Sequence, residues 1–394
     1  MTLTDLVALN PNYTGFDSIT WYVGNALQAS SFFVTRFGFQ VIAYRGPETG
    51  SHLISAYVLS NGSAVMLFMA PIRGLGDTKD ARASKEDDQL LREIHTHLTK
   101  HGDGVKDIAF GVSNVHQVWQ YAVANGAKSI QSPRVLVEPD LGEVCCAIIG
   151  TYGDTTHSLI DRSRYKGVFQ PGFRPVTLSD PVNDILPAVE FIDIDHCVGN
   201  QPWGGLETTV KFYEQALDFR RYWTVDDREM CSEYSAMRSV VVASPNEVIK
   251  MPLNEPAVGK KKSQIEEFVD YYNGAGCQHI AFSTKDIVET VNHLAKRGVH
   301  FLKVPESYYV TLRQRLQGKH AKVAEQLNIL QKSNILVDFD EGGYLLQIFA
   351  KHVLDRPTVF IEIIQRENFD GFGAGNFKSL FTAFEQEQAS RGNL

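Results

Sequence analysis

The sequence of 394 residues has few of the features that would place it outside ordinary globular proteins. Its cysteines are odd in number and include no Cys-x-x-Cys pair: Cys145, Cys146, Cys197, Cys231 and Cys277. This usage argues against a disulfide framework and predicts reduced, mostly buried thiols. The first residues lack a basic segment and an apolar core, and no run approaches the roughly 18 apolar residues of a spanning helix. We therefore expect a cytoplasmic protein without a membrane span.

Positive charge is also scarce, because 38 Lys and Arg residues face 46 Asp and Glu residues, a net charge of −8. Without a basic excess, a nucleic acid or an anionic membrane surface is not an expected partner. The hydrophobic fraction of 43% and the charged fraction of 21% are typical of a globular protein. A chain of this length exceeds what one hydrophobic core usually organises, so we expect two domains.

The expected boundary is a proline-rich stretch without helical or strand periodicity, which contains Pro171, Pro175, Pro181 and Pro187. Such composition is typical of an interdomain linker. The predicted division is an N-terminal domain over 1–170, a linker over 171–187 and a C-terminal domain over 188–394.

The two flanks repeat each other. FDSITWYVGN at 16–25 matches FIDIDHCVGN at 191–200, and GVKDIAFGVSNV at 104–115 matches GCQHIAFSTKDI at 276–287. Strand-like runs alternate with helical periods, so each half is predicted to hold two βαβββ units. The predicted fold class is α+β, with two similar domains that each form an open curled β-barrel flanked by helices.

Three further local predictions concern the second half. ILVDFD and YLLQIFA are expected to form a hairpin in which the Gly342-Gly343 turn supplies positive φ angles. One helix is expected over about 307–330, and a last helix from Phe377 onward. The glycines at 371, 373 and 375 lack the context of a phosphate-binding loop, so a hinge for this last helix is the better interpretation.

Residues with metal-ligand chemistry occur in the second half where the first half has other side chains: His196 opposite Trp21, His279 opposite Asp107, and Glu362 opposite Ser158. Each interrupts an apolar strand-like run. A carboxylate inside a barrel needs a counter-charge, which a divalent cation supplies. Two imidazoles and one carboxylate form the facial triad of non-haem Fe(II) oxygenases, and zinc accepts the same set. The residue types alone therefore leave iron and zinc open.

At these residues the sequence resembles the 4-hydroxyphenylpyruvate dioxygenase family, particularly its animal members. The resemblance runs from about Phe16 to Gly392 and includes IDHCVGNQP, TYGDTTHSLI, GYLLQIFAK, DRPTVFIEIIQR and GFGAGNFKSLFTAFE. It implies the vicinal-oxygen-chelate, or glyoxalase-like, fold with Fe(II) in the C-terminal half only. It also implies an enzyme of tyrosine and phenylalanine catabolism that converts 4-hydroxyphenylpyruvate and O2 to homogentisate and CO2, by oxidative decarboxylation, ring hydroxylation and side-chain migration.

Matched residue by residue, the family's metal ligands correspond to His196, His279 and Glu362. Its polar pocket residues, which would orient the phenol or the tail of the substrate, correspond to Ser239, Asn254, Gln264, Gln278 and Gln347. Its substrate-binding wall corresponds to Phe349, Phe360, Phe372, Asn376, Phe377 and Phe381, with Phe349 and Phe377 on either side of the ring. The resemblance further implies a homodimer that pairs through the N-terminal halves, and a C-terminal helix that covers the barrel mouth.

Three other functions compete with this interpretation. A 4-hydroxymandelate synthase would share the metal and substrate but hydroxylate the benzylic carbon, although Pro252, Asn254 and Phe349 match the ring-hydroxylating pattern. A non-catalytic binding or scaffold protein would retain the fold without the chemistry, and the intact ligand set argues against it. A zinc hydrolase or isomerase would use the same ligands without consuming O2.

Overall fold

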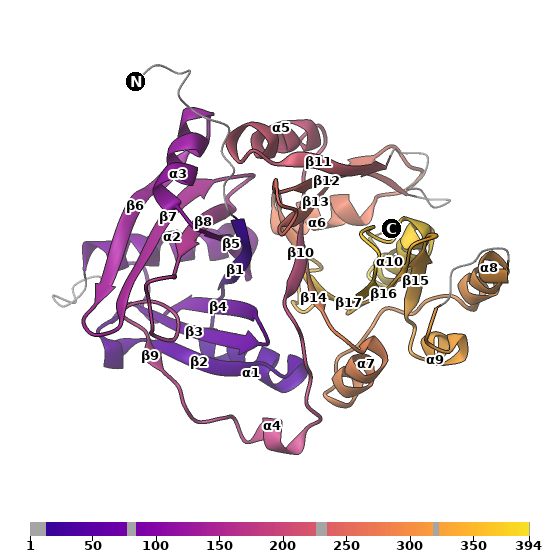
Figure 1. The fold of residues 1–394 in the computed structure, drawn as a ribbon, viewed down its shortest axis with the longest axis horizontal. Coiled ribbons are helices and arrows are strands. Elements are labelled where there is room, and N and C mark those ends of the chain that lie inside the picture. The colour runs from indigo at the N-terminus through magenta and orange to yellow at the C-terminus, as the bar shows by residue number, and fades with distance from the viewer. Residues whose placement is uncertain (1–12, 77–83, 226–234, 318–322, 394) are drawn as a thin grey trace.

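The computed structural model describes residues 13–76, 84–225, 235–317 and 323–393 (Figure 1). Each half of the chain builds one curled sheet, and the two sheets occupy opposite sides of the molecule in Figure 1. The N-terminal half contains β1 (Tyr13–Tyr22), α1 (Ala26–Phe37), β2 (Gln40–Arg45), β3 (Ile54–Asn61), β4 (Ala64–Pro71), α2 (Lys85–His101), β5 (Gly104–Val112), α3 (Val115–Ala124), β6 (Ser129–Glu138), β7 (Gly142–Gly150) and β8 (Thr156–Asp161).

The C-terminal half follows the same plan with additional helices. It contains β10 (Ile194–Asn200), α5 (Leu206–Ala216), β11 (Arg220–Val225), β12 (Ala236–Ala243), β13 (Lys250–Ala257), α6 (Gln264–Tyr272), β14 (Gly276–Ser283), α7 (Ile287–Lys296), α8 (Glu306–Gln317), α9 (Leu327–Lys332), β15 (Leu336–Phe339), β16 (Tyr344–Phe349), β17 (Phe360–Glu367) and α10 (Phe377–Ser390). Among the helices of the described ranges, none is both long and apolar enough to cross a membrane.

The sheet topology repeats between the halves, with β10, β14 and β17 in the places of β1, β5 and β8. The strand orders are β6-β7-β8-β5-β1-β4-β3-β2-β9 and β11-β12-β13-β10-β14-β17-β16-β15. In the first half β1 runs parallel to β4 and antiparallel to β5. In the second half β10 runs parallel to β13 and antiparallel to β14 in the same way. The expected α+β fold of paired βαβββ units is confirmed.

The predicted linker contains a two-stranded contact and a short helix. β9 (Arg174–Pro175) pairs with β2, and α4 (Val182–Ile185) follows it. The halves also contact each other directly: the hydroxyl of Tyr213 on α5 lies 2.8 Å from Nε2 of the buried His157 on β8. One continuous apolar core therefore spans both halves.

Helix α6 places one polar residue next to the second sheet. Ser263 caps the helix by accepting a hydrogen bond from the Glu266 amide, and the Glu266 carboxylate accepts one from the Ser263 amide. The helix ends at Asn273, whose φ of 59° lies in the left-handed region. This reciprocal cap fixes the start of the helix and so the position of Gln264, its first residue.

Strands β15 and β16 form the expected hairpin, but the expected turn conformation is wrong. Neither Gly342 nor Gly343 adopts a positive φ. The Asp340 carboxylate instead accepts hydrogen bonds from both glycine amides, at 2.7 and 2.9 Å. Glycine is needed at 343 for a different reason, since a Cβ there would lie 2.0 Å from the carbonyl oxygen of Glu367.

Two other local predictions can be compared with the structure. The single helix expected over 307–330 is wrong, because α8 and α9 are separate and residues 323–326 are not helical. The sequence of the expected helix includes Gly318, and glycine is a poor helix former. The four cysteines in the described ranges are unpaired, with Cys197 and Cys277 buried and Cys145 and Cys146 half-buried. Cys231 lies outside the described residues.

Candidate metal centre

Three neighbouring strands bring His196, His279 and Glu362 to one face of the second sheet. β14 lies between β10 and β17, and its Ala281 is opposite both His196 on β10 and Glu362 on β17. His279, two residues before Ala281, points to the same face because strand side chains alternate. Residues 83 positions apart in sequence thereby become neighbours in the curl of the sheet.

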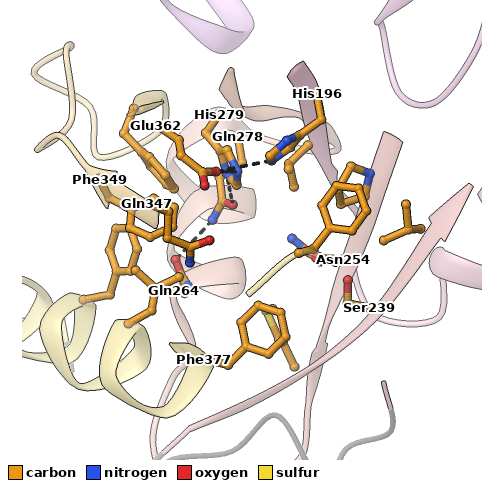
Figure 2. Close-up of a pocket in the computed structure, with 18 residues that line it drawn as sticks. His196, Ser239, Asn254, Gln264, Gln278, His279, Gln347, Phe349, Glu362 and Phe377 are labelled. Atoms are coloured by element: carbon orange, nitrogen blue, oxygen red, sulfur yellow. Dashed lines mark hydrogen bonds and ion pairs between the residues drawn. The ribbon is translucent and has the colours of Figure 1, made fainter. Parts of the chain in front are cut away.

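The three side chains converge (Figure 2). Nε2 of His196 and Nε2 of His279 each lie 3.2 Å from Oε2 of Glu362. One ligand atom from each residue lies within 4.8 Å of the others, and all three side chains are buried. The imidazole rings are 5.6 Å apart at an angle of 77°. Both Nε2 atoms and the carboxylate therefore face a common point.

The opposite ring nitrogens are held by other side chains. Nδ1 of His196 lies 2.6 Å from a carboxylate oxygen of Asp195. Nδ1 of His279 lies 3.2 Å from Oε1 of Gln278, whose amide donates to Oε1 of Gln264 at 3.2 Å. A proton on each Nδ1 leaves the lone pair of Nε2 directed at the common point, which is the tautomer that metal ligation requires.

The electrostatics of the cluster suit a cation. Burial disfavours an imidazolium at His196, but the carboxylates of Glu362 and Asp195 outweigh this effect and raise the pKa of His196 to about 9. Burial lowers the pKa of His279, although Glu362 opposes the shift. Burial also disfavours a charged Glu362, yet the two imidazoles hold the pKa of this carboxyl below its ordinary value. A bound divalent ion would take the place of the proton on Nε2 of His196, and the proton on Nδ1 would remain.

This donor set fits a first-row divalent metal. Two neutral imidazoles and one carboxylate, all buried and convergent, match the facial arrangement that leaves coordination positions open. Within the described parts of the chain, His196, His279 and Glu362 form the one group of three or more His, Cys, Asp or Glu residues whose ligand atoms converge in this way. The structure therefore contains a candidate metal site, and its geometry admits both iron and zinc.

The ligands form one end of a cavity with a free volume of about 50 Å³. Most of the residues predicted for the site line it: His196, Ser239, Asn254, Gln264, Gln278, His279, Gln347, Phe349, Phe360, Glu362, Phe372 and Phe377. Ser239 and Asn254 are paired neighbours on β12 and β13, and the Asn254 amide donates to Oδ1 of Asn200 at 3.3 Å. Polar groups thus lie on two sides of a cavity whose other walls are aromatic and aliphatic (Figure 2).

Two predicted substrate-binding residues lie outside this lining. Oδ1 of the fully buried Asn376 is bound by the hydroxyl of Tyr308 on α8, at 2.8 Å. Phe381 is buried one helical turn after Phe377, in a cluster with Met237 and Ile265. In this structure Asn376 anchors the segment before α10, and Phe381 supports the wall that Phe377 forms.

Sequence reasoning did not identify several residues of the site. The apolar ones that line the cavity are Val198, Met237, Val241, Leu380 and Phe384. Val198 is two residues after His196 and Phe384 is seven after Phe377, so strand and helix periodicity could have placed them there. Asp195 was also missed, and strand alternation alone assigns it to the face opposite His196.

The equivalent position in the first half has different chemistry. The carboxylate of Asp107, opposite His279 in the repeat, accepts hydrogen bonds from the Thr156 hydroxyl at 2.6 Å and the Ser158 amide at 3.3 Å. The expected match of His196 with Trp21 is wrong, because the strand register places Ser18 there. Ser18 pairs with Ala109 on β5 as His196 pairs with Ala281, the equivalent alanine on β14. Two serines, Ser18 and Ser158, and a hydrogen-bonded acid thus occupy the positions that hold ligands in the second half.

Comparisons with known proteins agree with this geometry. A sequence model of the Glyoxalase/Bleomycin resistance protein/Dioxygenase superfamily matches residues 193–348. The chain is 62% identical to a protein of Aspergillus fumigatus named probable 4-hydroxyphenylpyruvate dioxygenase 2, over 98% of this chain and 96% of that protein. It is 54% identical to the 4-hydroxyphenylpyruvate dioxygenase of Yarrowia lipolytica, over 97% of this chain and 94% of that protein.

A solved structure is similar over the same extent. A mutant of 4-hydroxymandelate synthase from Streptomyces coelicolor superimposes with a TM-score of 0.78 at 29% identity, covering 95% of this chain and 99% of that chain. Each of the two relatives named above is identical to this chain at more than half of the aligned positions, over nearly its full length. The chain therefore belongs to the 4-hydroxyphenylpyruvate dioxygenase family.

Proposed function

We propose that this chain is a dioxygenase that converts 4-hydroxyphenylpyruvate and O2 to homogentisate and CO2 in the catabolism of tyrosine and phenylalanine. The observation that carries the proposal is the buried convergence of His196, His279 and Glu362 at one end of a phenylalanine-lined cavity. The names of the relatives supply the substrate and the reaction class.

The proposed metal is Fe(II), held by the two Nε2 atoms and the Glu362 carboxylate. When bound, it would supply the redox chemistry that O2 requires and a Lewis acid for a chelating 2-oxo acid. A charge count supports this substrate class, since +2 from the metal, −1 from Glu362 and −1 from the substrate carboxylate sum to zero. A neutral centre is compatible with a site of low dielectric constant.

The side chains of the cavity would bind and orient the substrate. Phe349 and Phe377, 4% and 8% exposed, would hold the aromatic ring by offset or edge contacts. Ser239 and Asn254 on one side, and the amide chain of Gln264 and Gln278 on the other, offer hydrogen bonds to the phenol or the tail. Gln347, Phe360 and Phe372 complete the proposed wall and help to exclude water.

The size of the cavity supports a proposal of movement during turnover. A free volume of about 50 Å³ holds only a few water molecules, whereas small-molecule sites commonly enclose about 300 Å³ or more. Phe372, Phe377, Leu380 and Phe384 all come from the last segment of the chain, at or just before α10. We propose that this segment opens to admit the substrate and closes over it.

The other proposals concern the whole chain. Residues 1–170 would form a domain without a metal site that serves assembly, 171–187 the linker, and 188–394 the catalytic domain. A homodimer through the N-terminal halves and a cytoplasmic location remain predictions. The sheet topology supports the division, because each proposed domain contains one complete sheet apart from the β9 contact.

A 4-hydroxymandelate synthase is the second candidate, since a solved structure with that name superimposes well. Sequence identity favours the dioxygenase, because the chain is 54–62% identical to the two relatives named as dioxygenases and 29% identical to the synthase. Both enzymes consume O2 and the same 2-oxo acid, so the product must be identified. A zinc hydrolase or isomerase would consume no O2, and a scaffold protein would have no turnover.

The test is O2 uptake by the purified protein with 4-hydroxyphenylpyruvate, with and without added ferrous iron, followed by product identification by mass and NMR. We expect iron-dependent uptake and homogentisate. His279→Ala should abolish uptake, while His116→Ala, which removes an exposed imidazole on α3, should leave it unchanged. Iron-independent turnover, or 4-hydroxymandelate as the product, would refute the assignment.

A further inference from the structure

We propose that Asp195 and Arg366 form a positioning pair that orients His196 toward the metal and connects this ligand to the pocket wall at Phe372. The inference rests on the metal site of the proposed function. It concerns two residues that touch neither the cavity nor the point where the three ligands converge.

A β-bulge makes the contact between Asp195 and His196 possible. Adjacent residues of a regular strand point to opposite faces. The pairing of β10 with β14 shifts between Ile194 and His196, so that Asp195 is left without a partner in the ladder. Its carboxylate can then reach Nδ1 of His196 at 2.6 Å. Bulges that redirect a side chain in this way are common beside active sites.

The carboxylate of Asp195 is held in turn by the guanidinium of Arg366 on β17. Nε donates to one carboxylate oxygen at 2.7 Å and Nη2 to the other at 2.9 Å, which is the bidentate geometry of a strong ion pair. The side chains are 13% and 19% exposed, so water screens the pair little. Asp195 therefore has one fixed orientation in which to accept from His196.

The same guanidinium also fixes the backbone that precedes α10. Its Nη1 donates to the carbonyl oxygens of Phe369 and Gly371, at 3.1 and 2.6 Å. Its face lies 5.2 Å from the ring of Phe372, and this ring makes an edge contact with His196 at 5.2 Å between centroids. A closed circuit of contacts thus joins the metal ligand to the segment that covers the cavity.

The first half of the chain provides an internal comparison. Arg162 occupies the position of Arg366 in the repeat, and it also binds a carboxylate bidentately, with both distances 2.7 Å. Its partner is Asp17, which takes the place of Asp195, because each aspartate lies in the bulge just before a residue that pairs with an alanine. That residue is Ser18, opposite Ala109, in the first half and His196, opposite Ala281, in the second. The ion pair is thus common to both halves. The residue that its carboxylate holds differs, since Asp17 accepts a hydrogen bond from Ser18 at 3.0 Å and Asp195 holds the ligand His196.

The chemical consequence is a defined tautomer. A carboxylate at Nδ1 keeps the proton on that nitrogen, raises the basicity of the ring and directs the Nε2 lone pair to the metal. Removal of such partners weakens metal binding by roughly 10- to 100-fold in metalloproteins. Asp195→Asn keeps an oxygen acceptor but removes the charge and the bidentate pairing with Arg366.

The experiment measures Co(II) binding to the metal-stripped full-length chain by competition with a chelator, and records the visible spectrum of the bound ion. For Asp195→Asn we expect an affinity roughly 10- to 100-fold lower than wild type and shifted Co(II) bands. Asp17→Asn breaks the equivalent pair in the first half and should change neither. Arg366→Lys keeps the charge but loses the bidentate geometry, so it should also weaken binding, and it carries the test if Asp195→Asn does not fold.

Each outcome has a distinct meaning. If the wild-type chain binds no Co(II), the metal site and the proposed function both fail. If wild type binds but Asp195→Asn, or Arg366→Lys in its place, matches it in affinity and spectrum, only the positioning role fails. An equal loss of affinity in Asp17→Asn would assign the effect to general stability and would also overturn the role.

Discussion

The most quantitative prediction concerns a buried histidine between the two halves. His97 on α2 is 5% exposed, and neither of its ring nitrogens has a hydrogen-bond partner among the described residues. Its ring packs against Tyr22, His101 and the Tyr272 of α6, with centroid distances of 5.4, 4.9 and 6.3 Å. We predict that His97→Phe reduces the acid sensitivity of the fold.

The size of the expected change in unfolding free energy follows from the pKa of His97. Burial, aided by electrostatic repulsion from the neighbouring His101 and Lys106, lowers the pKa of His97 from 6.5 to about 3. As pH falls below 6.5 the unfolded chain takes up a proton that the folded chain does not, so stability is lost down to about pH 3. At about pH 5 the loss from this one group is about 2 kcal/mol relative to neutral pH.

The assay is urea unfolding at a series of pH values from about 7.5 to 5. The stability of the wild type should fall more steeply than that of His97→Phe, with the two curves diverging by about 2 kcal/mol at the acid end. His116→Phe controls for the removal of an imidazole as such. Parallel curves for wild type and His97→Phe would show that His97 accepts a proton in the folded state and would refute the reasoning.

Three further predictions concern the cavity and its counterpart. Phe377→Ala removes an aromatic contact of about 0.5–1.5 kcal/mol, so KM for the keto acid should rise up to roughly tenfold with metal content unchanged; an unchanged KM would place the ring elsewhere. Burial raises the pKa of Asp107 to about 6 despite its bond to Thr156, so Asp107→Asn should raise the stability measured by urea unfolding, by up to about 3 kcal/mol at pH 8 but not below pH 3.8. An equal gain at both pH values would contradict this. Gly373→Ala introduces a Cβ 2.5 Å from Gln347 at a φ of 75°, which should lower kcat/KM roughly tenfold through displacement of that amide and a strain of about 1–2 kcal/mol; wild-type kinetics would contradict it.

Much of the fold could be predicted because the chain contains its own comparison. Two copies of one scaffold share their apolar strand residues, so positions such as His279 against Asp107 stand out without any second sequence. Strand alternation then placed Phe360 with Glu362, and both line the cavity. A resemblance to a known family supplied the polar residues that no periodicity identifies, Gln264 among them.

The features that could not be predicted depend on local backbone geometry. A period of two assigns Asp195 to the wrong face because it cannot reveal a β-bulge. The contact of the Asn376 Oδ1 with the Tyr308 hydroxyl is hidden by the distance between the two residues in sequence, and the binding of substrate by Asn376 stays a prediction. The turn at Gly343 reflects a close approach to Glu367, which only the folded register creates.

The central claim is that one divalent iron is held by His196, His279 and Glu362. The most direct measurement is an anaerobic titration of the metal-stripped chain with Fe(II) and 4-hydroxyphenylpyruvate, monitored for the charge-transfer absorption of the chelate. We predict one equivalent of bound iron and a visible band on addition of the keto acid, with both absent in Glu362→Gln. Full iron binding and the same band in Glu362→Gln would contradict the site.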